Sequence, residues 1–117
     1  MMLNQGDIVL VPIPFSNLTS QKRRPVLILS NNEYNQRYQD IIAAAITSNV
    51  LEREYQTIIT NDEIAEGELK VDSAIRADKI YTLSQSIVIK KFGRVHPEVL
   101  LNVKKQIDNW LLGTDRE

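Results

Sequence analysis

Hydrophobic and polar positions alternate, or apolar positions form short runs, over most of the chain. This pattern predicts short β-strands. We expect them at residues 7–12, 25–30, 41–47, 55–60, 71–83 and 87–95, the fifth as two pieces around residues 76–78. Pro25 should open the second strand, where a missing N–H does least harm. Polar segments separate the strands, and residues 31–40 and 61–67 each have room for a helical turn.

The hydrophobic period changes after the last strand. Apolar side chains then recur at spacings of three and four, which predicts an amphipathic helix: Val99, Leu100, Val103, Ile107, Trp110 and Leu111. Pro97 suits the first helical position and Gly113 the stop, while His96 is interpreted as a helix-entry residue. Several strands followed by one helix indicate an α+β fold, a small, strongly bent antiparallel barrel. We expect one domain over residues 1–113 and a loose tail at residues 114–117.

Composition narrows the class of protein. The chain has 117 residues, 43% of them hydrophobic and 25% charged, which is ordinary for one globular domain. It has no cysteine, no phosphate-binding glycine loop and no cluster with metal-ligand spacing, so we expect neither a metal nor another cofactor. We see no signal peptide and no apolar run near the ~20 residues of a membrane helix. A cytoplasmic protein is therefore expected.

Charge is distributed unevenly, although the net charge is only −1. One basic cluster is Lys22-Arg23-Arg24, and a second combines Lys90-Lys91 with Arg94. Acidic residues between positions 62 and 72 separate the two clusters. A cluster of this kind is most often a solvated loop, so it does not by itself establish nucleic-acid binding.

Several segments in order carry a family resemblance. They are Gly6-Asp7-Ile8-Val9, residues 22–30 (KRRPVLILS), residues 44–48 (AAITS), residues 72–79 (DSAIRADK) and Thr82-Leu83. With the terminal helix, this set resembles the MazF/PemK toxins over nearly the whole chain. The resemblance implies an SH3-like barrel, a homodimer and a cognate antitoxin as partner. It also implies sequence-specific cleavage of single-stranded RNA, without a metal, through attack by a 2′-hydroxyl that leaves a 2′,3′-cyclic phosphate.

The resemblance also implies site residues. The family's catalytic arginine falls on Arg24 and its catalytic threonine on Thr47. In the Kid/PemK branch an arginine and an aspartate two residues apart are catalytic, and Arg76 and Asp78 match that pattern. That branch also uses a histidine in the first loop, and residues 13–21 contain none. The mechanism of the Kid/PemK branch therefore cannot be carried over to this chain in full.

Each of these residues has a simpler interpretation. Arg24 can hold two phosphate oxygens with its fork, or lie in a solvated turn. Thr47 is a poor base, and either positions the substrate or bonds nearby backbone. Arg76 and Asp78 can form a local ion pair, and Asp78 can act as a base only if its pKa is raised.

For RNA binding we expect Lys22, Arg23 and, for base stacking, Phe15. Tyr34, Tyr38, Tyr55 and Tyr81 are either further stacking surfaces or core residues.

Two other functions remain open. Small barrels of this kind host many activities, so a non-catalytic nucleic-acid-binding or regulatory protein is one alternative. The other is a gyrase-poisoning toxin like CcdB, which shares the fold and acts through a tryptophan near its C-terminus. Trp110 lies inside the helical stripe, and we interpret it as packing in the core or a dimer interface. The sequence names neither the RNA target sequence nor the antitoxin.

Overall fold

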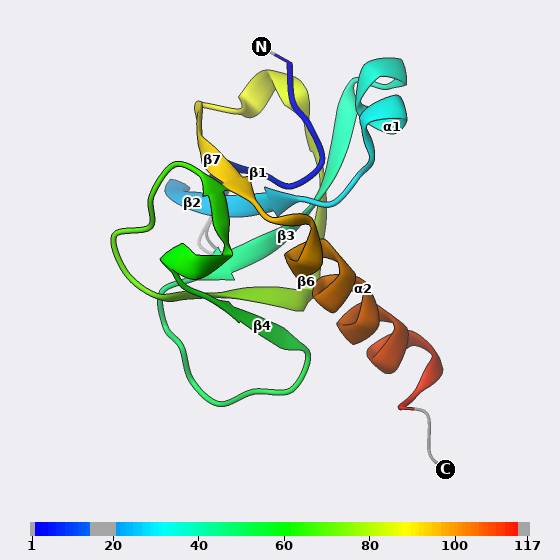
Figure 1. Ribbon diagram of the computed structural model, residues 1–117. Helices are drawn as coiled ribbons and strands as arrows, with labels where there is room; N and C mark the ends of the chain where they lie inside the picture. The colour runs from blue at the N-terminus through cyan, green and yellow to red at the C-terminus, as the bar shows by residue number, and fades with distance from the viewer. Residues whose placement is uncertain (1, 15–20, 115–117) are drawn as a thin grey trace.

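The computed structural model describes residues 2–14 and 21–114, and in these ranges seven strands form one antiparallel sheet. The strands are β1 (Asp7–Pro14), β2 (Gln21–Ile28), β3 (Asp40–Thr47), β4 (Gln56–Ile59), β5 (Ile64–Glu66), β6 (Ser73–Ser84) and β7 (Lys90–Val95). Their order across the sheet is β4-β6-β3-β2-β1-β7-β5. The sheet curls into a nearly closed barrel beside a C-terminal helix, which confirms the predicted α+β barrel (Figure 1).

The helices begin and end at the residues that their capping chemistry favours. Helix α1 (Asn32–Arg37) follows Asn31, whose side chain accepts a hydrogen bond from the backbone N–H of Tyr34. Helix α2 (Pro97–Leu112) begins directly after His96 and ends at Gly113, which has a φ of 87°. The predicted terminal helix and both of its boundary signals are confirmed. Short 3₁₀ turns, η1 (Asn61–Glu63) and η2 (Gln85–Ile87), connect strands.

Two apolar layers pack on the two faces of the sheet. The first contains Ile8, Leu27, Ala44, Ile46, Ile59, Ile75, Val99 and Val103, and α2 covers part of it by packing on β4 and β6. The second contains Val9, Val11, Val26, Ile28, Ile41 and Ala43. Successive residues of the central strands therefore enter different layers, which explains their continuous apolar runs.

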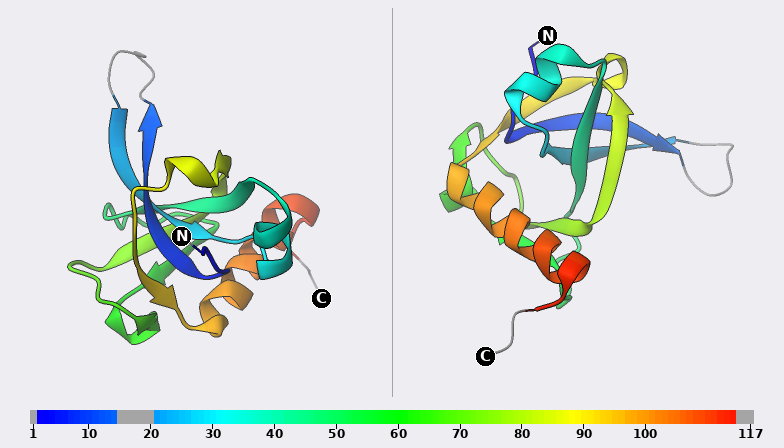
Figure 2. Two further views of the ribbon diagram at one scale, coloured as in Figure 1. Left: turned by 90° about the horizontal axis from the view of Figure 1, so that it is seen from above. Right: turned by 90° about the vertical axis from the view of Figure 1, so that its right-hand side faces the viewer.

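The predicted start of the second strand is wrong. Strand β2 begins at Gln21, so Lys22, Arg23 and Arg24 belong to the strand rather than to a loop. Pro25 lies inside β2, opposite Leu10 of β1. It is tolerated there because pairing of β2 with β3 begins only at the next residue, so one side of the strand is still unpaired at the proline. The paired ends of β1 and β2 extend beyond the rest of the barrel (Figure 2).

Strand β6 contains a bulge where the sequence predicted a break between two pieces. Arg76 lies opposite Ala45 of β3, and Ile80 lies opposite the adjacent Ala44. Residues 77–79 therefore have no partner on β3. Pairing of β6 with β4 also ends at Arg76. The expected helical turn within residues 61–67 is η1, but the same segment also contains β5, which was not predicted.

A buried carboxylate joins the first and last strands of the sheet in chain order, β1 and β7. Asp7 is fully buried and accepts hydrogen bonds from Arg94 Nε at 3.0 Å and from the backbone N–H of Asn4 at 2.8 Å. Lys91 Nζ lies 3.2 Å from the same carboxylate. The bond to Asp7 is the main cause of a raised pKa for Arg94. Part of the second basic cluster therefore ties β7 to β1.

Candidate active site

A cavity of about 670 Å³ lies on the second face of the sheet, over β2, β3 and β6. Its polar lining consists of Arg24, Thr47, Arg53, Arg76, Lys79 and Tyr81. Its apolar lining includes Val26, Ala45 and Leu83. The cavity thus combines four cationic side chains with an apolar floor, which suits a ligand that has both negative charge and planar apolar surface.

Strand register explains why residues far apart in sequence meet there. Val26, Ala45 and Arg76 form one row across β2, β3 and β6, and paired residues point to the same face. Arg24 is two residues before Val26 and Thr47 is two residues after Ala45. Since side chains two residues apart in a strand point the same way, both lie on that face as well. The structure therefore brings Arg24, Thr47 and Arg76, three of the four predicted catalytic residues, into one cavity.

Arg76 and Asp78 form the local ion pair that the sequence left open. Arg76 Nε lies 3.0 Å from Oδ1 of Asp78, and Nη2 lies 2.9 Å from Oδ2, which is a two-bond fork. The hydrogen bond is the main cause of a raised Arg76 pKa and a lowered Asp78 pKa, and the charge of Arg53 lowers the latter further. The condition for Asp78 to act as a base, a raised pKa, is not met. Its carboxylate instead holds the guanidinium of Arg76 in place.

Thr47 ends β3 at the cavity wall. Its Oγ1 accepts a hydrogen bond from the backbone N–H of Asn49 at 3.1 Å, as in the simpler interpretation of this residue. That bond fixes the oxygen but uses only its acceptor capacity. The hydroxyl can still donate toward the cavity.

The predicted RNA-binding residues differ in position. Lys22 and Arg24 alternate with Arg23 along β2, so Lys22 shares the face of Arg24 whereas Arg23 points to the opposite face. Both Lys22 and Arg23 are exposed, but neither lines the cavity. Phe15 lies outside the described residues.

Arg53 and Lys79 are cavity residues that the sequence analysis did not single out. Lys79 closes the matched segment of residues 72–79 and lies in the β6 bulge, which is the one feature that points to it. Arg53 belongs to the connection between β3 and β4, where no periodic pattern indicates which way a side chain faces. Tyr81, one of the possible stacking residues, is half-buried in the cavity wall. His96 is exposed at the start of α2, and its backbone N–H bonds the carbonyl of Glu63.

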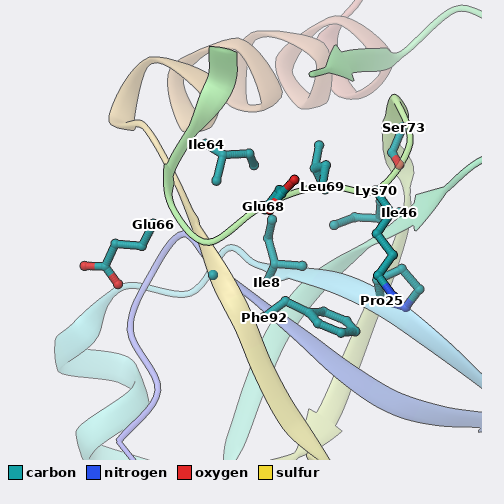
Figure 3. A pocket seen from close by; sticks show the side chains of 11 residues that line it. Ile8, Pro25, Ile46, Ile64, Glu66, Glu68, Leu69, Lys70, Ser73 and Phe92 are labelled. Atoms are coloured by element: carbon teal, nitrogen blue, oxygen red, sulfur yellow. The ribbon is translucent and has the colours of Figure 1, made fainter. Parts of the chain in front are cut away.

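A second cavity, of about 290 Å³, lies on the opposite face and is mostly apolar (Figure 3). Ile8, Ile46 and Phe92 border it, and Glu68 and Lys70 lie at its rim. It has no cluster of cations, so it does not offer the same chemistry. In the part of the chain that the structure describes, no group of three or more histidine, aspartate or glutamate residues could hold a metal ion. Nor does any helix within residues 2–14 and 21–114 have the length and apolar character to cross a membrane.

The sequence matches a family model over residues 4–111. That model describes the PemK-like, MazF-like toxins of type II toxin–antitoxin systems. No curated protein matches the chain significantly in sequence.

Solved structures share the whole fold at low identity. An endoribonuclease from a mycobacterial species, solved in complex with its cognate antitoxin, superposes with a TM-score of 0.78 at 18% identity, covering 97% of this chain and 99% of the other. A MazE–MazF structure from Deinococcus radiodurans gives 0.77 at 21% identity over 98% and 100% of the two chains. The Mycobacterium tuberculosis toxin MazF-mt6 gives 0.70 at 17% identity over 92% and 99%.

Proposed function

Because the chain belongs to the PemK-like, MazF-like toxins of type II toxin–antitoxin systems, we propose that it is an endoribonuclease that cuts single-stranded RNA without a metal. The observation that carries the proposal is the convergence of Arg24, Thr47 and Arg76 in one cavity lined by four cations. Residues from β2, β3 and β6 supply this set, and all three lie within the matched residues 4–111.

The chemistry that fits the cavity is attack of a ribose 2′-hydroxyl on the adjacent phosphorus. The 2′ oxygen loses its proton and forms the new bond, while the bond from phosphorus to the 5′ oxygen breaks and that oxygen takes up a proton. The products are a 2′,3′-cyclic phosphate and a 5′-hydroxyl. Negative charge builds on the non-bridging oxygens during this step, and fixed donors aimed at those oxygens accelerate it.

The residues present can divide this work. Arg24 and Arg76 supply paired N–H donors for the phosphoryl oxygens, and Asp78 keeps the Arg76 fork oriented before substrate arrives. Thr47 positions the attacking hydroxyl or a phosphoryl oxygen through its own O–H. Arg53 and Lys79 suit flanking phosphates. Tyr81, beside the apolar floor, offers a surface on which an unpaired base can stack.

A cognate antitoxin and a second copy of the chain are the partners we propose, together with action in the cytoplasm, where messenger RNA is available. Two of the similar structures contain an antitoxin beside the toxin. With a net charge of only −1, attraction of an acidic antitoxin segment must come from local cations such as Lys22 and Arg24. The complex should therefore weaken as salt rises. A salt-independent affinity would contradict this account.

Cleavage assays test the proposed activity directly. The protein should cut single-stranded RNA in excess EDTA, and a 2′-deoxyribose at the cut position should stop cleavage while binding is nearly unchanged, because the nucleophile is missing. The folded Arg24→Ala variant, purified in the same way, controls for a contaminating nuclease. Loss of cleavage in EDTA with recovery in magnesium, or cutting of the deoxy substrate, would overturn the mechanism.

The same assay separates the alternatives. A non-catalytic barrel would bind RNA and leave it intact. A gyrase poison would instead trap gyrase on plasmid DNA, and would need its C-terminal tryptophan for that. Trp110 Nε1 already bonds the carbonyl of Ala77 at 2.9 Å, which does not favour a recognition role for this ring.

A further inference from the structure

One residue of the β6 bulge, Ala77, is held on both sides by groups outside β6. The N–H of Ala77 donates to the carbonyl of Tyr55 at 2.9 Å. The carbonyl of Ala77 accepts from the indole Nε1 of Trp110, also at 2.9 Å. Ala77 stands between Arg76 and Asp78, the two residues of the forked ion pair. Any shift of this short segment therefore moves both of them.

These two bonds replace a missing strand ladder. Residues 77–79 have no partner on β3, and β4 pairs with β6 only up to Arg76. A bulge without such bonds has several accessible backbone conformations, because the ladder no longer specifies one. The bonds to Tyr55 and Trp110 select the conformation in which Arg76 faces the cavity.

Each of the two anchors is itself fixed. Tyr55 has a φ of 60°, a left-handed conformation that is uncommon outside glycine and persists only where its surroundings determine it. Strand β4 begins at the next residue and pairs with Arg76. Trp110 lies near the end of α2, and this helix packs on β4 and β6 through Val99 and Val103 (Figure 1).

Partial exposure argues that Trp110 does more than fill the core. Trp110 is 41% exposed, so of its two interpretations packing in the core is wrong, while a dimer interface stays a prediction. Val99 and Val103 are the buried residues of this helix, whereas the indole of Trp110 donates to the bulge at Ala77. An aliphatic side chain would fill a half-exposed site equally well but has no N–H to donate.

We propose that Trp110 is a positioning residue for the ribonuclease reaction, holding the Ala77 carbonyl and through it the orientation of Arg76 and Asp78. This inference rests on the proposed function. It adds α2, which contributes no lining residue to the cavity, to the elements on which the rate of cleavage depends.

The Trp110→Phe variant removes the N–H and keeps an aromatic ring. We expect kcat to fall about 10-fold with KM changed less than about 2-fold, since a small displacement of a catalytic group lowers the rate more than it weakens binding. Lys105→Ala, an exposed change on the same helix, should leave both constants unchanged. Wild-type kcat in Trp110→Phe would overturn the proposal, as would a rise in KM with kcat unchanged.

A double-mutant cycle tests whether Trp110 acts through Arg76. In an Arg76→Ala background, Trp110→Phe should cause no further loss of kcat, because the group it positions is already absent. Two losses that multiply would mean that Trp110 acts by another route, and would count against the proposal. If Trp110→Phe does not fold, replacing Trp110 by 3-benzothienylalanine removes only the N–H from a ring of nearly the same shape.

Hydrogen exchange supplies a readout that does not depend on RNA. Trp110 is the only tryptophan, so the wild type has one indole N–H resonance, which should exchange slowly with solvent. The amide of Ala77 should exchange faster in Trp110→Phe than in wild type, and fast indole exchange in wild type would contradict the bond. If the wild type cuts no RNA, the proposed function fails, while these exchange rates still decide whether Trp110 holds the bulge.

Discussion

Arg24 and Arg76 face the same cavity but are held very differently. Arg76 is fixed by two hydrogen bonds to Asp78 in a bulge anchored at Ala77. Arg24 is exposed on the end of β2 that extends beyond β3, opposite Val11 of β1. A donor that is already oriented, such as Arg76, stabilises the transition state without reorganisation, whereas the exposed Arg24 is also accessible to incoming substrate.

Substitution of Arg24 is the most direct test at the residue scale. Arg24→Lys keeps the charge but not the fork, so we expect much of the RNA binding to remain while cleavage falls on the order of 10²-fold. Arg24→Ala should lose cleavage almost entirely, with little change in melting temperature because the side chain is exposed. Single-turnover cleavage and binding assays measure the two effects separately.

Arg23 provides the matched control for these variants. It is adjacent in sequence and has the same charge, but it points to the opposite face of β2. Arg23→Ala should therefore reduce cleavage only slightly. Equal, mild losses in Arg23→Ala and Arg24→Ala would indicate a solvated basic patch, and failure of Arg24→Ala to fold would indicate a structural role.

The lowered pKa of Asp78 predicts how cleavage depends on pH. Asp78 holds its proton more weakly in the folded than in the unfolded chain, so its pair with Arg76 is fully formed above the unfolded value near 3.8. The pair is lost only as pH falls through the still lower folded value. Asp78→Asn should thus reduce kcat by one constant factor from about pH 5 to about pH 8. A factor that changes with pH in this window would mean that Asp78 titrates there, as a base would.

At the scale of elements, the patterns that repeat along the chain were the most informative. Helix α2 was predictable because Pro97, Gly113 and a clear helical period agree. The apolar runs of β2 and β3 correctly indicated strands, and the structure shows that their residues enter both apolar layers. The true start of β2 was missed because charged residues in a projecting strand do not differ from those in a loop.

The bulge in β6 shows a second limit of predicting structure from sequence periodicity. Ile75 and Ala77 enter the first apolar layer, whereas Tyr81 and Leu83 enter the second, although all four are odd-numbered. The alternation breaks at Asp78 and Lys79, two polar residues in a row, which is why two separate pieces were predicted. That break does not reveal that one continuous strand passes through a bulge and changes face. Arg53 was missed for a related reason, since its direction depends on the β3–β4 connection rather than on any period. The bond from Trp110 to Ala77 spans 33 positions and has no local pattern.

Gly93 of β7 should tolerate no side chain, because β5 approaches it closely. A Cβ at this position would lie 2.1 Å from the backbone carbonyl oxygen of Glu66. Since backbone cannot move aside as a flexible side chain does, Gly93→Ala should lower the free energy of unfolding by about 2 to 3 kcal/mol. Urea denaturation measures this. Gly113→Ala is the control, because a Cβ there has nothing within 4 Å and carries only the cost of a left-handed φ of 87°, roughly 1 kcal/mol.

At the scale of the whole molecule, α2 leaves large apolar side chains uncovered near its start and at its end. Leu101, Leu111 and Leu112 are 67%, 61% and 82% exposed. Large apolar side chains left exposed along one helix are typical of an association surface. They support the homodimer that the family resemblance implies, with α2 near its interface.

Sedimentation tests the proposed dimer. The wild type should sediment as a dimer at micromolar concentration, and Leu112→Glu should shift it toward monomer by placing a charge in the interface. The exposed Lys105→Ala change should have no effect. A wild-type monomer at this concentration would count against the dimer, and an unchanged dimer in Leu112→Glu would place the interface elsewhere.

The pairing of β1 with β7 has a consequence for how the protein is made. Asp7 and Arg94 are 87 positions apart, yet they close the barrel on one side of β1. A ribosome releases β1 long before β7. One edge of β1 therefore lacks its partner strand, and the carboxylate of Asp7 lacks Arg94, during most of synthesis. Closing so long a loop is also slow. The nascent chain therefore completes its barrel only after residue 95 has emerged, and an interrupted chain that lacks β7 would present an open edge to other strands.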